Sequence, residues 1–323
     1  MAVLGVESSA HTLGMGIVQD GKIVANEKLM YQIADKGMIP SKVADFHVGN
    51  VGRLLKATLR AAGLSLDDID AVGYTKGPGM GACLRVGHVC AAYLSDMAGV
   101  PIFPVNHGLA HIEVAKSLLG IRDPIALYVS GGNSQIVAAR GKPAKYHIYG
   151  ETFDMGIGNM IDSFARAAGL NPAWGSTVAK TAMGGKYLQM PYTVRGMDFT
   201  FTGLLTNAVG MLKGHNIRDV SYSLQETAFS MLCEATERAL LLTKKREVVL
   251  CGGVAQSPRL REMVSDVASE HDARFGAAAD EFNADNGAMI AVVAEKMLKS
   301  GMHVSKSDCT TSQRYRLEGV RVP

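Results

Sequence analysis

The sequence predicts an α/β fold built from two lobes of similar plan. The chain has 323 residues, which suits two lobes of ~150 residues each better than one small core. A strand, a turn of small residues and a returning strand occur at 3–25, and the same pattern recurs at 125–148. Helical periodicity follows each copy, so the pattern favours an internal duplication.

The remaining elements alternate between helix and strand. Asn106, Pro258 and Asp285 are expected at helix starts, the first and last of them as caps. We expect an N-terminal lobe of residues 1–122 plus 288–323, with a helical insertion near 30–62, and a C-terminal lobe of residues 123–287. The expected helices span 43–62, 86–97, 107–119, 155–168, 222–243, 258 onward and 287–299, and the further strands span 71–74, 102–105 and 247–250.

Composition limits the class of protein. Apolar residues make up 47% and charged residues 20%, which is an ordinary globular balance and excludes a disordered chain. The net charge of +3 permits a nucleic-acid partner without requiring one. Five cysteines without a C-x-x-C pair indicate reduced thiols, and neither the N-terminus nor the apolar stretch 86–103 resembles a membrane segment. We therefore expect a cytoplasmic protein with no membrane partner.

Three turns of small residues are candidate phosphate-binding loops. They span 7–12, 130–134 and 252–257, and each follows an apolar strand. Backbone N–H groups at such turns bind phosphate without basic side chains. Neither a P-loop motif nor a Rossmann glycine fingerprint is present. The sequence predicts a nucleotide held between the two lobes, with plain tight turns as the alternative.

A histidine pair is the candidate metal site. His107 and His111 are spaced i, i+4 on an expected helix, so one face presents both rings to a single ion. Tyr128 and Asp285 are candidate further ligands. The alternatives are a solvated histidine pair, a strand aromatic at Tyr128 and a plain cap at Asp285. Gly108 stands where a zincin carries its glutamate base.

Two aspartates near the second hairpin are further candidates. Asp154 precedes an expected helix and suits a cap. Asp162 suits a contact to ribose hydroxyls, or equally a first-turn acid that interacts with the helix dipole.

These motifs together resemble the universal tRNA threonylcarbamoyltransferase family, most closely its archaeal and eukaryotic branch. The resemblance covers residues 3 to about 294 in order. It implies an actin-like ATPase (ASKHA) fold with a nucleotide cleft between the lobes. The matching segments are 5–9, 76–79, 106–111, 128–133, 251–255 and 285–289.

The resemblance also assigns residues to the site. It implies one divalent metal, iron or zinc, on His107, His111, Asp285 and Tyr128. The general base is not identified. Ala179 and Ser257 depart from the family pattern, which has an acid and an asparagine at the matching positions. The residues implied in nucleotide and substrate binding are Tyr128, Val129, Ser130, Gly131, Gly132, Asn133, Asp162, Gly175, Gly252, Gly253 and Ser257.

The activity implied is transfer of a threonylcarbamoyl group from threonylcarbamoyl-AMP to N6 of adenosine 37 in tRNA, with release of AMP; ATP is a second possible nucleotide. The implied partners are tRNA and the KEOPS subunits: a small dimerising subunit, a small protein kinase and a further small subunit. The helix at 43–62 has an apolar stripe that suits packing on its own sheet, and we predict that the exposed part of this helix docks the small dimerising subunit. A metallopeptidase and an ATP-binding scaffold are the alternative functions.

Overall fold

The computed structural model describes residues 1–32 and 38–322, and it divides into two compact units. Unit 1 comprises Met1–Ser117 and Ala284–Pro323, and unit 2 comprises Leu118–Asn283. These limits lie a few residues from the expected lobe boundaries, and they place Asp285 in unit 1. Part of the expected insertion, residues 33–37, lies outside the described residues.

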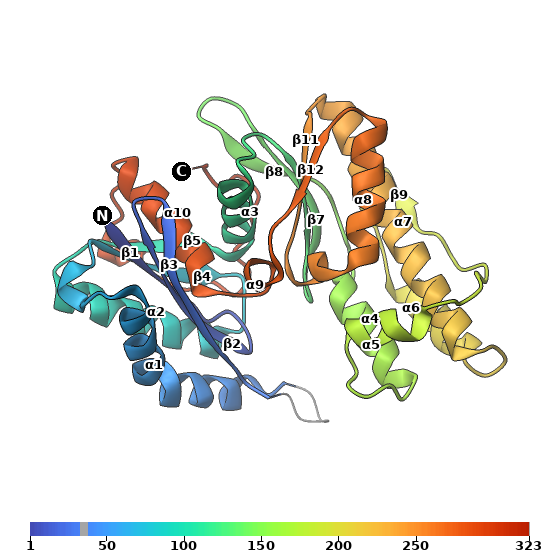
Figure 1. The fold of residues 1–323 in the computed structure, drawn as a ribbon, viewed down its shortest axis with the longest axis horizontal. Coiled ribbons are helices and arrows are strands. Elements are labelled where there is room, and N and C mark those ends of the chain that lie inside the picture. The colour runs from blue at the N-terminus through green and yellow to red at the C-terminus, as the bar shows by residue number, and fades with distance from the viewer. Residues whose placement is uncertain (33–37, 323) are drawn as a thin grey trace. The chain divides into compact units, whose positions relative to one another are not determined.

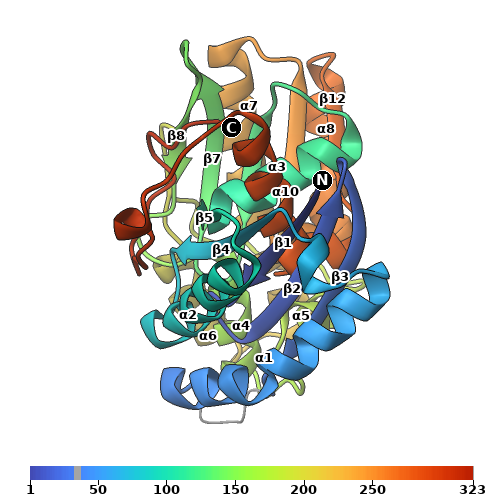
Figure 2. The ribbon, with the colours of Figure 1, turned by 90° about the vertical axis from the view of Figure 1, so that its left-hand side faces the viewer.

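Unit 1 contains a mixed five-stranded sheet. Its strand order is β3-β2-β1-β4-β5, in which β1, β2 and β3 are antiparallel neighbours and β1, β4 and β5 run parallel. Figure 2 shows the sheet with β3 at one edge and β5 at the other. The strands are β1 (Ala2–Glu7), β2 (Thr12–Gln19), β3 (Lys22–Met30), β4 (Ala71–Gly77) and β5 (Ile102–Asn106).

Helices cover both faces of this sheet. The long helices α1 (Pro40–Ala62) and α2 (Gly81–Ala98) lie on one face, and α10 (Gly287–Lys299) lies on the other (Figure 1). Since α1 contacts β2, β3 and α2, the expectation that this helix packs on its own sheet is confirmed. The remaining elements of the unit are α3 (His107–Leu119) and the 3-10 turns η1 (Leu66–Asp68) and η3 (Lys306–Asp308).

Glycines bring α10 unusually close to the sheet. A Cβ added at Gly5 would lie 2.3 Å from the backbone N of Ala291. One added at Gly287 would lie 2.2 Å from the backbone N of Gly16. Only glycine permits such backbone-to-backbone contact. The first turn of α10 is therefore fixed against β1 and β2 by main-chain atoms.

Unit 2 repeats the plan of unit 1. Its sheet has the order β8-β7-β6-β11-β12, with an antiparallel meander followed by parallel β6, β11 and β12. This is the order of unit 1 strand for strand, which confirms the duplicated two-unit α/β plan. The strands are β6 (Ile125–Val129), β7 (Ser134–Arg140), β8 (Lys145–Glu151), β11 (Glu247–Cys251) and β12 (Arg274–Ala277), with the small pair β9 (Val194–Arg195) and β10 (Asp198–Phe199).

The helices of unit 2 bury one large apolar core with this sheet. The buried residues Phe164, Leu224 and Leu250 contribute from two helices and a strand. Figure 1 shows α7 and α8 side by side along the strands. The helices are α4 (Ile157–Ala167), α5 (Gly175–Ala182), α6 (Thr202–Met211), α7 (Ile217–Thr243), α8 (Pro258–Glu270), α9 (Asp280–Asn283) and the 3-10 turn η2 (Gly253–Gln256).

Two expected helix caps are wrong. Asn286, and not Asp285, caps α10: its side-chain oxygen accepts a hydrogen bond from the backbone N of Met289 at 2.9 Å. Asp154 does not cap α4, whose N-cap position is taken by Gly156 without a side-chain hydrogen bond. Its carboxylate instead accepts from the backbone N–H of Thr202 at 2.7 Å, at the start of α6. In both cases tertiary contacts select the partner.

The pKa of Asp154 leads to a pH-dependent prediction. Partial burial raises this pKa, but hydrogen bonds from Thr202, Phe201 and Met155 lower it to about 2. The usual value is ~3.9, so the stabilisation is complete above about pH 4 and is lost as the pH falls toward 2. Because Asp154 is exposed, we discount the shift and expect Asp154→Asn to lower the free energy of unfolding at pH 7 by about 1 kcal/mol. Urea denaturation at pH 7 and pH 2 checks this; an equal loss at both pH values would contradict it.

Across residues 1–32 and 38–322, the structure holds no helix with the length and apolar character that crossing a membrane requires.

Candidate metal and nucleotide site

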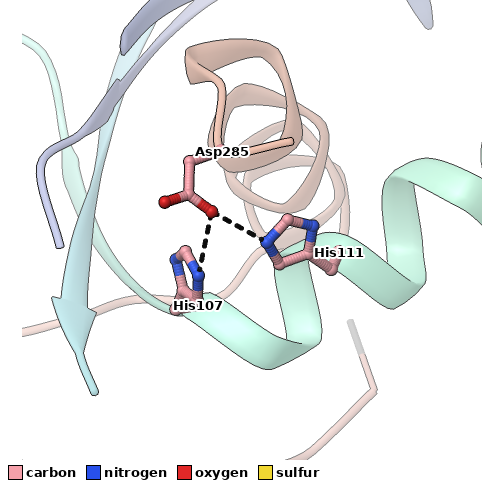
Figure 3. Close-up of side chains that lie close together, drawn as sticks. All are labelled: His107, His111 and Asp285. Carbon is pink, nitrogen blue, oxygen red and sulfur yellow. Dashed lines mark hydrogen bonds and ion pairs between the residues drawn. The ribbon is translucent and has the colours of Figure 1, made fainter. Parts of the chain in front are cut away.

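Three side chains of unit 1 converge on one point. His111 Nε2 lies 3.3 Å from Asp285 Oδ1, and His107 Nε2 lies 3.5 Å from the same oxygen (Figure 3). The ligand atoms of the three residues all lie within 4.8 Å of one another, a spacing suitable for one metal ion. The two histidines are 7% and 1% exposed. The structure thus brings together three of the four expected metal ligands.

Local structure fixes the direction of these side chains. Asn106 ends β5 and its side-chain oxygen accepts from Leu109 N at 3.1 Å, so it caps α3 as expected. The two histidines then occupy the first and second turns on one face, with their rings nearly perpendicular at a centroid distance of 4.8 Å. Asp285 stands directly before the Asn286 cap of α10.

Glu7 orients the His107 ring, a role that the sequence did not predict. Its buried carboxylate lies 3.0 Å from His107 Nδ1 and also accepts from Thr75 Oγ1 at 2.6 Å and from Ser9 N at 2.5 Å. A His107 ring that binds a metal through Nε2 would therefore keep its proton on Nδ1, where the Glu7 carboxylate accepts it. Glu7 thus holds the ring in the direction that metal coordination requires.

The role of Glu7 follows from its place in the sheet. Glu7 ends β1, Thr75 stands two residues before the end of β4, and His107 directly follows β5, and these three strands run parallel. Carboxyl ends of parallel strands meet at one edge, where sites are commonly found. The turn at 7–12 was interpreted instead as a phosphate loop, but Ser9 N–H donates within the chain to Glu7.

The electrostatics of the triad favour a bound cation. Burial lowers the pKa of His111, so its ring is neutral. Burial by itself raises the pKa of Asp285, but the two neighbouring histidines outweigh this effect and hold the pKa well below its usual value. Burial also raises the pKa of Glu7, and His107 outweighs it and keeps the carboxyl ionised. An ionised carboxylate and two imidazole nitrogens thus face one point.

The expected phosphate loop of unit 2 forms a tight turn. Ser130 N donates to Asn133 O at 2.7 Å, and Gly158 N and Asn159 N at the start of α4 donate to Ser130 O and Gly131 O. The first amides of α4 are therefore used by the loop. The exposed N–H groups of Gly131 and Gly132 donate to no acceptor within the described ranges. These two amides are the ones open to a phosphate.

Other expected nucleotide residues lie around this loop. Asp162 stands in the second turn of α4, which removes the first-turn dipole interpretation. Gly175 begins α5, and its added Cβ would lie 3.5 Å from Ile161 of α4. Gly252 has φ 94° and approaches the carbonyl of Val129 so closely that a Cβ would lie 2.3 Å from it.

Further positions follow β11. Gly253 begins η2, and Ser257 caps α8 through its hydroxyl, which accepts from Leu260 N at 3.4 Å. Tyr128 is 1% exposed near the end of β6, beside Cys251 of β11. It belongs to unit 2, so its place in the metal shell stays a prediction.

A solved structure identifies the fold class. The crystal structure of full-length HypF in its phosphate- and nucleotide-bound form is similar at a TM-score of 0.63, with 13% identity, over 94% of this chain and 56% of that chain. At this identity the likeness concerns the fold alone. With the duplicated sheet order, it establishes the two-unit actin-like ATPase fold.

Sequence comparison identifies the family within that class. The family model for tRNA N6-adenosine threonylcarbamoyltransferase matches residues 21–292. An enzyme of that name from Caldivirga maquilingensis is 43% identical over all of this chain and 98% of its own length. A probable bifunctional tRNA threonylcarbamoyladenosine biosynthesis protein from Thermoplasma volcanium is 45% identical, and this chain spans 61% of it. The chain belongs to the tRNA N6-adenosine threonylcarbamoyltransferase family.

Proposed function

We propose that this chain transfers the threonylcarbamoyl group of threonylcarbamoyl-AMP to N6 of adenosine 37 in tRNA. The observation that carries the proposal is the convergence of His107, His111 and Asp285 in a member of this family. A C–N bond forms between N6 and the carbamoyl carbon. The bond from that carbon to the phosphate oxygen breaks, AMP leaves with the electron pair, and the amine gives up one proton.

The donor set of the triad fits a divalent metal. Two imidazole nitrogens and one carboxylate oxygen lie within 4.8 Å of one another, which is the ligand set and spacing that one divalent ion takes. Two imidazoles and one carboxylate suit iron or zinc equally. When bound, such an ion supplies Lewis acidity toward carbonyl oxygens. We propose Tyr128 as a further ligand.

The other residues of the site bind and orient. Glu7 holds the His107 ring by accepting from Nδ1. The open amides of Gly131 and Gly132 are suited to the phosphate of the adenylate or of ATP, the group that leaves as AMP. We propose that Asp162 and the residues after β11 contact the same nucleotide.

An assay of tRNA labelling tests the proposed activity. Labelled threonine, bicarbonate, ATP and an adenylate-forming enzyme are combined with this chain and tRNA. Label retained in tRNA supports the proposal. Unlabelled tRNA together with a cleaved protein substrate would contradict it and indicate a peptidase. Gly108, at the position of the zincin glutamate, disfavours that outcome.

The setting of this activity is also part of the proposal. We propose that the chain works in a KEOPS assembly with a dimerising subunit, a kinase and a further small subunit, which fits the archaeal relatives. A cytoplasmic location fits them as well. Docking of the dimerising subunit on α1 stays a prediction.

Replacing Glu7 tests the support of the metal site. Glu7→Gln keeps the shape but removes the charge and turns an amide nitrogen toward a donor, either Ser9 N–H or the Thr75 hydroxyl. Outer partners of ligating histidines typically contribute 10–100-fold to affinity, so we expect the dissociation constant for Zn²⁺ to rise roughly tenfold or more. Competition titration with a chromogenic chelator measures it. Glu270→Gln, at the exposed end of α8, is the matched control, and equal affinities in the two variants would contradict the role of Glu7.

A further inference from the structure

A continuous stretch of unit 2 carries positive charge without any acid. Residues 163–197 contain no Asp or Glu, and their four cations are Arg166, Lys180, Lys186 and Arg195, all exposed. No ion pair neutralises any of the four among residues 1–32 and 38–322. Such a charge distribution attracts a polyanion, although the whole chain has a net charge of only +3.

Exposed aromatic rings are interleaved with these cations. Trp174 and Tyr187 are each 55% exposed, and Tyr192 is 49% exposed. Large rings in solvent next to unpaired cations are the composition of surfaces that bind single-stranded nucleic acid, because every base has a face that stacks. Burial in the core does not account for these three rings.

The same stretch forms one wall of a pocket. Its volume is about 280 Å³, and it is lined by Tyr187, Tyr192, Tyr222, Glu226, Thr227 and Ser230. The irregular segment after α5 is hydrogen-bonded to α7: Leu188 N donates to Ser223 Oγ at 2.7 Å, and the hydroxyl of Tyr187 lies 3.2 Å from that of Thr227. The pocket is thus preformed, with rings on its walls and hydroxyl groups for hydrogen bonds.

We propose that residues 163–197 with this pocket form an RNA-binding surface that receives an unpaired nucleobase of the tRNA. The inference rests on the proposed function and places part of its macromolecular substrate on unit 2. The cations Lys186 and Arg195 contact phosphates on either side of the base, and the ring of Tyr187 stacks on it. The hydroxyl groups of Tyr222 and Ser230, which also line the pocket, bond the edge of the base.

The chemistry of the pocket disfavours a cationic ligand. A cage for an ammonium or guanidinium group combines aromatic rings with an unpaired carboxylate. Here Glu226 is already held by Arg259, whose Nε and Nη2 donate to the two carboxylate oxygens at 2.9 and 2.7 Å. Glu234, which accepts from the Tyr192 hydroxyl, is likewise paired with Arg238. Because both carboxylates are already paired and the exposed Lys186 directly precedes Tyr187, the surface favours phosphate over a basic peptide.

Binding of a tRNA transcript by full-length variants tests the inference. The probe is a fluorescent, unmodified tRNA with adenosine 3′ of its anticodon, and anisotropy is measured from 50 to 200 mM salt. We expect Lys186→Gln/Arg195→Gln to reduce the slope of log K against log salt by about 2, one for each lost phosphate contact. We expect Tyr187→Ala to weaken binding on the order of tenfold.

Matched controls separate ring, charge and fold. Tyr187→Phe keeps the ring and should bind within about twofold of wild type. Lys142→Gln removes an exposed cation at the turn between β7 and β8, outside the surface, and should leave the salt slope unchanged. Circular dichroism confirms that each variant is folded.

Several outcomes would overturn the inference. Wild-type affinity and salt slope in the Lys186/Arg195 and Tyr187→Ala variants would exclude this surface, and so would a Tyr187→Phe variant as weak as Tyr187→Ala. Loss of a co-purifying protein with unchanged tRNA affinity would assign the surface to protein docking. Failure of the proposed function is distinct: the wild-type chain would then leave tRNA unlabelled in the transfer assay, whatever its affinity.

Discussion

Replacing His107 or His111 by alanine is expected to abolish metal binding and threonylcarbamoyl transfer while the fold persists. Each ring supplies one of the three ligand atoms that lie within 4.8 Å of one another. Losing an inner ligand should cost more than the 10–100-fold that an outer partner contributes, so we expect an affinity loss of at least about 100-fold. Metal content after purification and titration of Co²⁺ into the metal-free variants measure this directly.

The control for this prediction is His215→Ala. His215 is exposed on unit 2 and outside the triad, so its loss should change neither metal content nor transfer. Thermal unfolding of all three variants shows whether the fold is retained. A His107→Ala or His111→Ala chain with full metal content and full activity would refute the site.

Gly287→Ala is expected to cause the largest loss of stability among the substitutions considered. The new Cβ would lie 2.2 Å from the backbone N of Gly16 and 2.2 Å from the backbone C of Met15. No side chain can yield there, so α10 must move away from β2, which we expect to lower the free energy of unfolding by about 3 kcal/mol. Because Asp285 stands two residues earlier, metal affinity should fall as well.

Gly52→Ala provides the opposite case. Gly52 lies within α1 with open space around its Cβ position. Alanine in a helix interior should raise the free energy of unfolding by up to about 1 kcal/mol. Chemical denaturation of the two variants measures whether the free energy of unfolding falls in Gly287→Ala and rises in Gly52→Ala. If Gly287→Ala were as stable as the wild type, the close approach of α10 would not have the importance assigned to it.

Much of the fold could be predicted from local pattern. The strand-turn-strand pattern of 3–25 and 125–148 covers β2 and β7 and parts of their antiparallel neighbours in each sheet, and period-3.6 apolar spacing located the long helices. The histidine pair was also readable, because i, i+4 spacing on a helix determines that two rings share a face.

The predictions that were wrong concern residues whose roles depend on contacts between distant segments of the chain. Asp285 and Asn286 are both good capping residues, and only the tertiary position of α10 decides that Asn286 caps while Asp285 points at the histidines. Asp154 likewise serves a helix 48 residues later in the chain. The role of Glu7 required knowing that β1, β4 and β5 are parallel neighbours, which no local pattern states.

The repeated sheet order has a consequence for how the molecule denatures. The core of unit 2 draws its buried residues from Ile125 to Ala268, and the core that α1 and α2 form with the sheet of unit 1 shares none of them. Each unit thus possesses the apolar interior that a separate cooperative block needs. Calorimetry should then record a total heat larger than the van't Hoff enthalpy of either step. Gly287→Ala would lower the melting temperature of the unit 1 step and leave that of the unit 2 step unchanged.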